Sequence, residues 1–312
     1  MSAVPTSDSG TADAPAGAVP ILFVHAHPDD ETLTTGVAMG HYARAGHPVH
    51  LLTCTLGEEG EVIPPELVEL DAAHGDRLGA YRREELRAAM EVLGVEHEVL
   101  GECSVDGVRS RYRDSGMAGT PTAANPAAFA NADLDEVAAL VAAVVRRVRP
   151  AAVVTYDRHG GYSHPDHIQT HRVTCAALAS LDAQDRPPLY AVLTPASWAR
   201  EDRRWLADHD IPAGWTVPDP DGAYPPSVVD DDVVTHELVL PEQVSLQAEA
   251  LRRHRTQVTV APDGLSYALS NDIAARLSGR EGFALLDPTT GDLVEASGGQ
   301  PRHTGLLSRD SR

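Results

Sequence analysis

The stretch ILFVHAHPDDE at residues 21–31 joins a short apolar run to a dense group of side chains that bind metals. Five of its first six residues are apolar, a pattern typical of a buried β-strand. Around Pro28 lie one imidazole and three carboxylates, those of His27, Asp29, Asp30 and Glu31. Open α/β sheets place their functional sites at the carboxyl ends of buried parallel strands. The stretch therefore predicts a strand that leads directly into such a site.

A second cluster of the same kind is GGYSHPDH at residues 160–167. It also follows an apolar run typical of a buried strand, AAVVTY at 151–156, and it also opens an expected helix. Because the carboxyl ends of parallel strands meet at one edge of a sheet, we expect the two clusters to lie together. They would then offer His27, Asp30 and His167, two imidazoles and one carboxylate. This set suits a catalytic zinc with an open position, and such sites also take Fe2+.

Asp29 remains beside this set as an uncoordinated carboxylate, which is the base that a metal-activated water needs. Taken alone, Asp29 or Asp166 would be interpreted as the N-cap of a helix. His171 lies one helical turn after His167 and competes with it as a candidate ligand. Two His-Pro-Asp triplets, both at the ends of expected buried strands, nevertheless favour a shared metal site.

The order of the expected elements predicts an α/β fold. Alternation of strands and helices implies right-handed parallel crossovers, and hence a mostly parallel sheet with helices on both faces. The expected strands are 21–26, 49–55, 95–100, 151–156, 189–194 and 233–240. The expected helices are 32–46, 77–93, 133–147, 166–181 and 241–254, and 101–132 is expected to be irregular.

Composition divides the chain into four parts. Residues 1–19 are rich in Ser, Ala, Pro, Gly and Asp and predict a disordered tail. Residues 20–185 form the expected α/β domain. Residues 186–292 form a smaller and more irregular region, which we expect to pack over the carboxyl ends of the strands. Residues 293–312 are expected to be a second tail.

The charge and the cysteines exclude several classes of protein. The chain has 25 Lys plus Arg against 46 Asp plus Glu, a net charge of -21, which disfavours nucleic-acid and membrane-surface partners. It contains no lysine, so it supports neither Schiff-base chemistry nor a P-loop. The three cysteines are isolated in sequence, which favours a reducing cytoplasm. The N-terminal stretch lacks the pattern of a signal peptide, and no apolar run approaches the roughly 20 residues of a spanning helix.

Two other enzyme or binding classes are excluded by their missing motifs. A nucleotide-binding Rossmann protein has a glycine fingerprint after its first strand, where this chain has residues 27–31. A serine hydrolase has a G-x-S-x-G elbow, which this sequence lacks. A metal-sensing or scaffold protein would need a closed coordination shell, whereas three candidate ligands beside a spare carboxylate indicate an open one.

The motifs AHPDDE and HPDH resemble the LmbE-type, or PIG-L-like, zinc N-deacetylase family. The resemblance covers most of residues 20–180. It extends through TCTLGEEGEV at 53–62, YRREEL at 81–86, RDSGMAGT at 113–120 and TYDRHGGYSHPDH at 155–167. This fuller set is similar to the branch of the family that removes acetate from N-acetylglucosaminyl-inositol in mycothiol biosynthesis. A related branch hydrolyses mycothiol S-conjugates at the same amide, and it stays open as an alternative.

The resemblance implies that residues 20–185 form a Rossmann-like deacetylase domain and that residues 186–292 help to wall the active site. It also implies one Zn2+ per chain on His27, Asp30 and His167, with Asp29 as the general base. It implies that Tyr162 stabilises the oxyanion. The departing amine would be protonated either by Asp29 or by His164, and the sequence does not choose between them.

The resemblance also assigns residues to the small amino-sugar inositol substrate. Arg82 and Asp114 suit the hydroxyl groups of this substrate as a donor and an acceptor, and Glu61 is a further candidate. Asp166 would contact the metal ligands without binding the metal itself. Four of the residues named from the resemblance have a simpler interpretation as well. Arg82 would pair with Glu85 or Glu58 on or near its helix, and Asp114 would be a turn residue. Glu61 would be a solvated residue of an acidic loop, and Tyr162 would pack in its glycine-rich loop. One departure from the family pattern is the pair Arg158-His159 before the two glycines.

Overall fold

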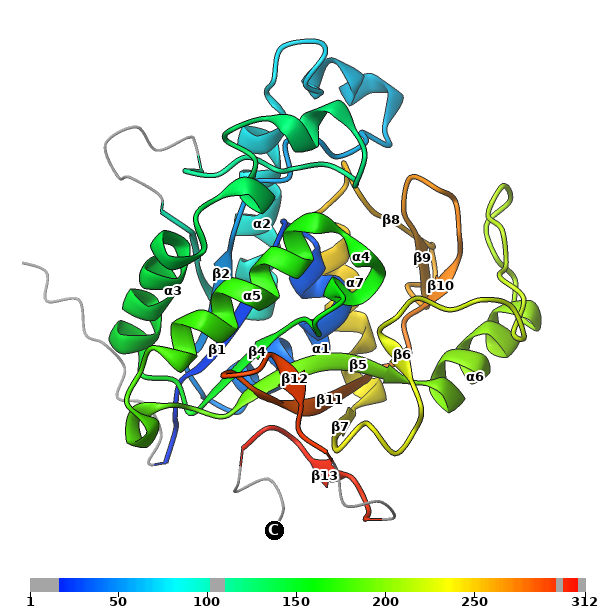
Figure 1. Cartoon of the computed structure of the whole chain (residues 1–312). Helices are drawn as coiled ribbons and strands as arrows, with labels where there is room; N and C mark the ends of the chain where they lie inside the picture. The colour runs from blue at the N-terminus through cyan, green and yellow to red at the C-terminus, as the bar shows by residue number, and fades with distance from the viewer. Residues whose placement is uncertain (1–16, 102–109, 296–299, 308–312) are drawn as a thin grey trace, which may run out of the picture.

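The computed structural model describes residues 17–101, 110–295 and 300–307. Most of the predicted N-terminal tail, residues 102–109 of the expected irregular stretch, and parts of the second predicted tail lie outside the described residues. The described residues form an α/β structure around one large sheet, drawn in Figure 1.

The strands are β1 (Ile21–His25), β2 (Val49–Thr53), β3 (Glu96–Val99), β4 (Ala152–Thr155), β5 (Leu189–Pro195), β6 (Val228–Val229), β7 (His236–Val239), β8 (Thr259–Val260), β9 (Ser266–Ala268), β10 (Ala275–Arg276), β11 (Arg280–Asp287), β12 (Asp292–Leu293) and β13 (His303–Thr304). The α-helices are α1 (Asp30–Arg44), α2 (Leu78–Leu93), α3 (Leu134–Val148), α4 (Gly160–Ser163), α5 (Pro165–Ala179), α6 (Ala196–Ala207) and α7 (Val244–Leu251). Short 3-10 turns are η1 (Pro65–Leu70), η2 (Pro121–Ala124), η3 (Phe129–Asn131), η4 (Ala183–Asp185) and η5 (Pro241–Gln243).

The central sheet has ten strands and the path β13-β7-β11-β5-β4-β1-β2-β3. From β3 to β5 all neighbours are parallel. The order 3-2-1-4-5 is that of a doubly wound Rossmann sheet, so the predicted fold class is confirmed. The direction of winding reverses between β1 and β4, and in such sheets ligands bind beyond the carboxyl ends of the strands at that point.

Helices cover both faces of the sheet (Figure 1). Helices α3 and α5 pack on one face, where Val141 and Val173 join a core with Leu22 of β1. Helices α1, α2 and α7 pack on the other face, where Tyr42 contributes to a second core with Phe23. Successive residues of β1 thus face opposite cores, which explains why its apolar run is unbroken.

Local signals set the helix ends. The Asp133 side chain accepts an N–H bond from Glu136 and so caps α3, as its acidic start predicts. Helix α2 ends at Gly94, whose φ of 75° is the left-handed conformation that glycine adopts at low cost. The expected helix at 241–254 is wrong at its start and its end, because η5 precedes a shorter α7.

The carboxyl-terminal part extends the same sheet. Strand β11 runs antiparallel between β5 and β7, so the boundary expected at residue 185 falls within one sheet. The tail expected from residue 293 is wrong for 303–307. Strand β13 pairs with β7, and Leu306 and Leu307 are 3% and 8% exposed in the second core. Burial of these two leucines and the pairing of β13 with the edge of β7 hold this segment against the sheet.

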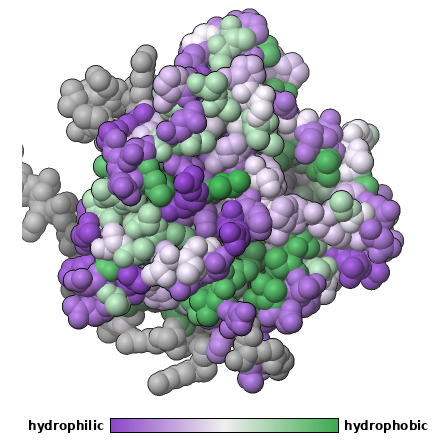
Figure 2. Space-filling model, in the orientation of Figure 1, coloured by the Kyte–Doolittle hydropathy of each residue, from purple (hydrophilic) through white to green (hydrophobic). Residues whose placement is uncertain are grey.

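Hydrophilic residues cover most of the molecular face in Figure 2, and hydrophobic residues gather there mainly over β5, β11 and β12. Among the described residues, no helix combines the length and the apolar character needed to span a membrane.

Candidate active site

The loop after β1 and the segment after β4 meet at the switch point of the sheet. The Nδ1 atom of His27 lies 3.3 Å from Oδ2 of Asp30 and 3.3 Å from Nε2 of His167. The third side of this triangle, from His167 Nε2 to Asp30 Oδ2, is 3.2 Å. All three residues are buried. The candidate ligand atoms of the three predicted residues therefore converge on one position.

The dimensions of this triangle fit a metal ion. A tetrahedral zinc with ligands at about 2.1 Å separates them by about 3.4 Å. The other ring nitrogen of His27, Nε2, lies 3.1 Å from Asp166 Oδ2 and 3.5 Å from Asp114 Oδ1. Two carboxylates at Nε2 place the proton there and leave the Nδ1 lone pair for a cation.

The charges around His27 also favour a cation. Burial lowers the pKa of His27, but Asp114, Asp166 and Asp30 outweigh burial and hold this pKa well above its usual range. A site that draws a proton so strongly onto an imidazole has an excess of negative charge. The described residues therefore can hold a metal ion here.

Two wider groups of candidate ligands also contain His27. One adds His164 and His167, and the other adds Asp114 and Asp166, with ligand atoms within 4.8 Å of one another. The second group meets at the Nε2 atom of His27, whereas the triangle with Asp30 meets at its Nδ1 atom. The sequence alternative His171 lies elsewhere: its Nδ1 is 3.0 Å from the carbonyl oxygen of Tyr156, and it is not among the residues that line the cavity.

Asp29 precedes α1, but its side chain makes no capping hydrogen bond. Its backbone has φ of 114°, a conformation that L-residues rarely adopt. Burial and the neighbouring carboxylate of Asp30 together raise the pKa of Asp29 to about 7, against the opposing effect of Arg82. A carboxylate that takes up a proton near neutral pH beside a candidate metal site has the properties of a general base.

Arg82 holds the loop that carries Asp29. Its Nη2 contacts Asp29 Oδ2 at 3.2 Å and the carbonyl oxygen of Pro28 at 2.5 Å, and its Nη1 donates to the carbonyl oxygen of Gly57 at 2.7 Å. The sequence alternative, an ion pair with Glu85 or Glu58, is wrong, since those carboxylates bind Thr256 and the Asp114 amide. Arg82 is 3% exposed. Both Nη atoms therefore bond to the protein itself, while the buried Nε has no hydrogen-bond partner among the described residues.

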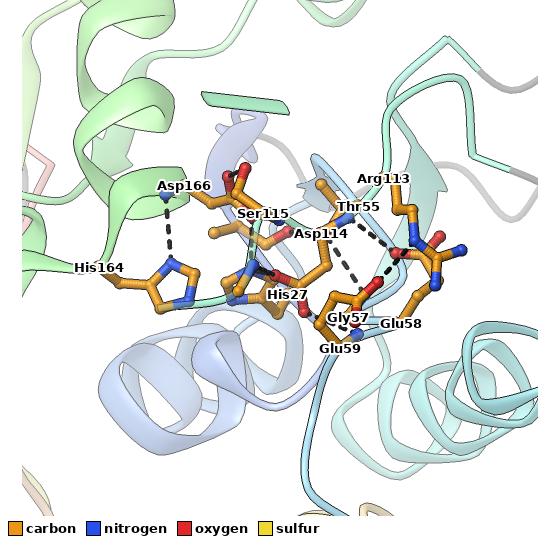
Figure 3. Close-up of polar contacts among 12 residues, drawn as sticks. His27, Thr55, Gly57, Glu58, Glu59, Arg113, Asp114, Ser115, His164 and Asp166 are labelled. Carbon is orange, nitrogen blue, oxygen red and sulfur yellow. Dashed lines mark hydrogen bonds and ion pairs between the residues drawn. The ribbon is translucent and has the colours of Figure 1, made fainter. Parts of the chain in front are cut away.

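Asp166, Ser115 and Asp114 lie next to His27 (Figure 3). The two oxygens of Asp166 accept the backbone N–H and the hydroxyl of Ser115. Asp114 accepts N–H bonds from Gly116 at 2.8 Å and from Glu59 at 3.2 Å. These bonds join three loops that are distant in sequence and fix the carboxylates next to His27.

His164 and Tyr162 complete the mouth of the site. The Nδ1 of His164 accepts the Asp166 N–H at 3.2 Å and caps α5, which leaves the proton on Nε2. Burial and the neighbouring His27 and His167 lower the pKa of His164 to about 3, so the ring is neutral. Tyr162 is 49% exposed in a loop where Gly161 has φ of 74°. Burial of its hydroxyl raises the phenol pKa, so it stays protonated and can donate.

These groups line one cavity of about 940 Å³. Asp114 and Glu61 line the part built from loops of the first half, and Trp198 and Arg276 line the part built from the carboxyl-terminal region. Arg158, the departure from the family pattern, does not line it, because this exposed side chain pairs with Asp292.

A buried ion pair beside Asp29 was not predicted from the sequence. Glu31 Oε1 lies 2.9 Å from His254 Nε2, and both residues are fully buried. Burial opposes both charges, but their attraction outweighs it, lowering the pKa of Glu31 and raising that of His254. Glu31 follows two aspartates in the first motif, whereas no sequence pattern marks His254.

Residues 22–178 match the family model described as PIG-L: GlcNAc-PI de-N-acetylase. The chain belongs to the PIG-L family. Every residue predicted for the site lies within the range that matches the PIG-L model, so the family assignment and the geometry concern the same part of the chain.

Similar proteins in other organisms carry one name, "1D-myo-inositol 2-acetamido-2-deoxy-alpha-D-glucopyranoside deacetylase". That of Rhodococcus opacus (strain B4) is 48% identical over 285 residues, which cover 87% of this chain and 93% of the relative. That of Thermomonospora curvata is 44% identical over 306 residues, which cover 92% and 96%. Among solved structures, the N,N'-diacetylchitobiose deacetylase from Pyrococcus horikoshii is similar with a TM-score of 0.48 and 18% identity, covering 80% of this chain and 73% of that one.

Proposed function

We propose that this chain is a zinc-dependent N-deacetylase that hydrolyses the acetamide of N-acetylglucosaminyl-inositol to a free amine and acetate, in mycothiol biosynthesis. The observation that carries the proposal is the buried Asp29 beside the triangle of His27, Asp30 and His167 in a PIG-L family chain. The substrate is proposed from the name shared by relatives that are 44% to 48% identical over most of the chain.

We propose His27, Asp30 and His167 as the ligands of one Zn2+ per chain, with Fe2+ as an alternative that this ligand set accepts. When bound, the ion supplies Lewis-acid polarisation of the acetamide carbonyl and a water acidified toward neutral pH. Asp166 would orient His27 by accepting a hydrogen bond from its Nε2–H, as carboxylates commonly do for imidazole ligands.

In this proposal, Asp29 accepts the proton of the attacking water, and Tyr162 donates a hydrogen bond to the oxyanion that forms on the carbonyl oxygen. The contact with Arg82 keeps the Asp29 carboxylate aimed at the site. The protonated phenol of Tyr162 is half-exposed and free to meet a substrate. Hydrogen-bond donors aimed at developing negative charge usually contribute the largest share of catalysis.

We propose that Asp29, rather than His164, protonates the departing amine. The Nδ1 of His164 accepts a backbone N–H and its ring is neutral, so its remaining N–H is a weak acid. His164 then serves as a hydrogen-bond donor through Nε2. Asp29 returns the proton that it took from water, so its carboxylate is regenerated in each cycle.

For the sugar and inositol hydroxyls we propose Asp114 and Glu61, which both line the cavity. Asp114 is buried and already accepts two backbone N–H bonds, which fixes its direction. For Arg82 we propose a main role in holding Asp29 rather than the substrate, because its bonds go to the protein.

We further propose that the enzyme works in a reducing cytoplasm without a nucleic-acid or membrane partner. Cys54 and Cys175 are free and buried, as in proteins of reducing compartments. The net charge of -21 repels phosphate backbones and anionic lipid. Activity found in the membrane fraction of the cell would contradict this location.

The test is acetate release by the purified, zinc-loaded protein from N-acetylglucosaminyl-inositol, with Asp29→Ala as the control. A mycothiol S-conjugate is offered in parallel. We expect acetate release that Asp29→Ala reduces by roughly a thousandfold or more, in the range seen when a catalytic residue is removed. Turnover of the conjugate alone would transfer the chain to the amidase branch. No turnover of either compound by zinc-loaded protein would overturn the substrate assignment.

A further inference from the structure

Asp29 keeps an unfavourable backbone conformation, with φ of 114°. Such a conformation persists only where the surroundings over-determine it. The Asp29 carbonyl accepts N–H bonds from Thr32 at 3.0 Å and Leu33 at 2.9 Å, which form the first turn of α1. The Asp29 N–H donates to Oε2 of Glu31 at 2.8 Å. The Glu31 side chain is therefore the group that holds the amide of Asp29.

Glu31 is held in turn by a residue from the far end of the chain. Its Oε1 lies 2.9 Å from His254 Nε2 and accepts the Thr32 hydroxyl at 2.6 Å. Glu31 and His254 are both 0% exposed. A buried carboxylate needs a charged partner, and loss of that partner leaves an uncompensated charge. His254 therefore fixes Glu31 in the orientation that receives the Asp29 amide.

The segment that carries His254 is anchored on helix α2. Thr256 donates its N–H and its hydroxyl to Glu85, at 2.9 Å and 2.6 Å. Glu85 lies three positions after Arg82, so both side chains leave the same face of α2. Helix α2 thus holds Asp29 by two routes: directly through Arg82 at the carboxylate, and indirectly through the His254 segment at the amide.

We propose that Glu31 and His254 are positioning residues for Asp29, which fix its backbone and thereby the direction of its carboxylate. This inference rests on the proposed function, in which Asp29 is the base. Neither Glu31 nor His254 is among the residues that line the cavity, so they act through Asp29 and not on the substrate. Loss of either should therefore lower kcat and leave KM nearly unchanged.

The experiment compares His254→Leu, which removes the donor, with His254→Gln, which keeps an N–H donor near the position of Nε2. We expect His254→Leu to lower kcat roughly 10-fold to 100-fold, because a misplacement of about 1 Å costs up to that much. His254→Gln should recover most of the loss. Bound zinc, measured by metal analysis, should equal that of the wild type in both. Leu251→Ala, at a fully buried core position on the same segment, is the control. It should lower the free energy of unfolding but leave kcat unchanged at temperatures below its Tm.

A double-mutant cycle identifies the residue through which His254 acts. In the Asp29→Ala background, His254→Leu should cost nothing further, because the group that it positions is absent. Thr256→Val, which keeps one bond to Glu85, should show a smaller loss that also vanishes in that background, and it serves if His254→Leu does not fold. Wild-type kcat in His254→Leu, or an equal loss in the presence and absence of Asp29, would overturn the inference.

A crystal structure of zinc-loaded His254→Leu separates this inference from the proposed function. We expect Asp29 either to leave the positive-φ region or to lose its contact with Arg82. If the wild type releases no acetate, the proposed substrate fails while this structural comparison still decides the positioning role. An unchanged Asp29 in the variant overturns that role whatever substrate is turned over.

Discussion

Arg82 Nη2 lies 3.2 Å from Asp29 Oδ2, so a helix residue holds the carboxylate that we propose as the general base. The same guanidinium binds the carbonyl oxygens of Gly57 and Pro28. A planar guanidinium reaches three acceptors in fixed directions, whereas the ammonium of lysine is a point charge on a flexible stem. Charge alone therefore does not explain this arrangement, and its geometry can be tested separately.

Arg82→Lys should lower kcat roughly 10-fold to 100-fold, since it keeps the charge and loses the directions that hold Asp29. It should also reduce the free energy of unfolding by about 1–3 kcal/mol, because buried carbonyl groups lose their donor. Steady-state kinetics and urea unfolding measure the two effects. Arg87→Lys, at an exposed position of α2, is the matched control and should change neither. Full activity in Arg82→Lys would show that charge is sufficient.

Asp166→Asn should weaken metal binding about 10-fold to 100-fold, the cost usually observed for losing a carboxylate behind an imidazole ligand. The reason is the 3.1 Å contact between Asp166 Oδ2 and His27 Nε2. Competition with a chelator measures the affinity, and removal of the metal should abolish acetate release until zinc is restored. Asp133→Asn, at the N-cap of α3, should leave the affinity unchanged. Equal affinities for Asp166→Asn and wild type would contradict the assignment.

Tyr162→Phe should lower kcat roughly 100-fold with little change in KM, as expected for the loss of one donor to an oxyanion. The hydroxyl makes no hydrogen bond to any other residue that the structure describes, and the side chain is 49% exposed, so the Tm should stay the same. Kinetics and a thermal melt test both statements. Tyr224→Phe, which removes a hydroxyl bound to Pro220 away from the cavity, should keep its kcat. A Tyr162→Phe enzyme altered mainly in KM would indicate a substrate-binding role instead.

The buried carboxyl group of Glu281 should make the free energy of unfolding depend on pH. Its carboxylate accepts N–H bonds from Val37 at 2.7 Å and Ala38 at 2.8 Å, and burial raises its pKa from 4.5 to about 8. Between these values the folded chain keeps a proton that the unfolded chain has lost. The free energy of unfolding therefore falls as pH rises through this window.

Glu281→Gln removes that titration. Relative to wild type, the variant should gain a few kcal/mol between about pH 5 and about pH 8.5, since each pH unit inside the window contributes about 1.4 kcal/mol. Urea unfolding of both proteins at the two pH values measures the difference. A difference that is the same at both values would mean that Glu281 titrates normally in the folded state.

The sequence by itself determined the fold class and which two clusters of polar side chains meet at the candidate site. Unbroken apolar runs alternating with helices imply a doubly wound parallel sheet, because parallel strands need crossovers of one hand. The first half of the candidate site could be predicted because His27, Asp29 and Asp30 lie in one strand-to-helix turn, and residues so close in sequence are also close in space. The second cluster, at the end of β4, meets the first because β1 and β4 are parallel neighbours and their carboxyl ends lie at the same edge of the sheet.

Only the tertiary structure decided what holds these groups in place. Arg82 and Asp29 are 53 positions apart and His27 and Asp166 are 139 apart, and no periodicity relates such pairs. The proposed positioning role of His254 depends on how α7 packs against α1 and α2. The burial of Leu306 depends on the pairing of β13 with β7. Local patterns determine elements and short turns, whereas the partner of a buried charge is selected by the packing of elements that are distant in the chain.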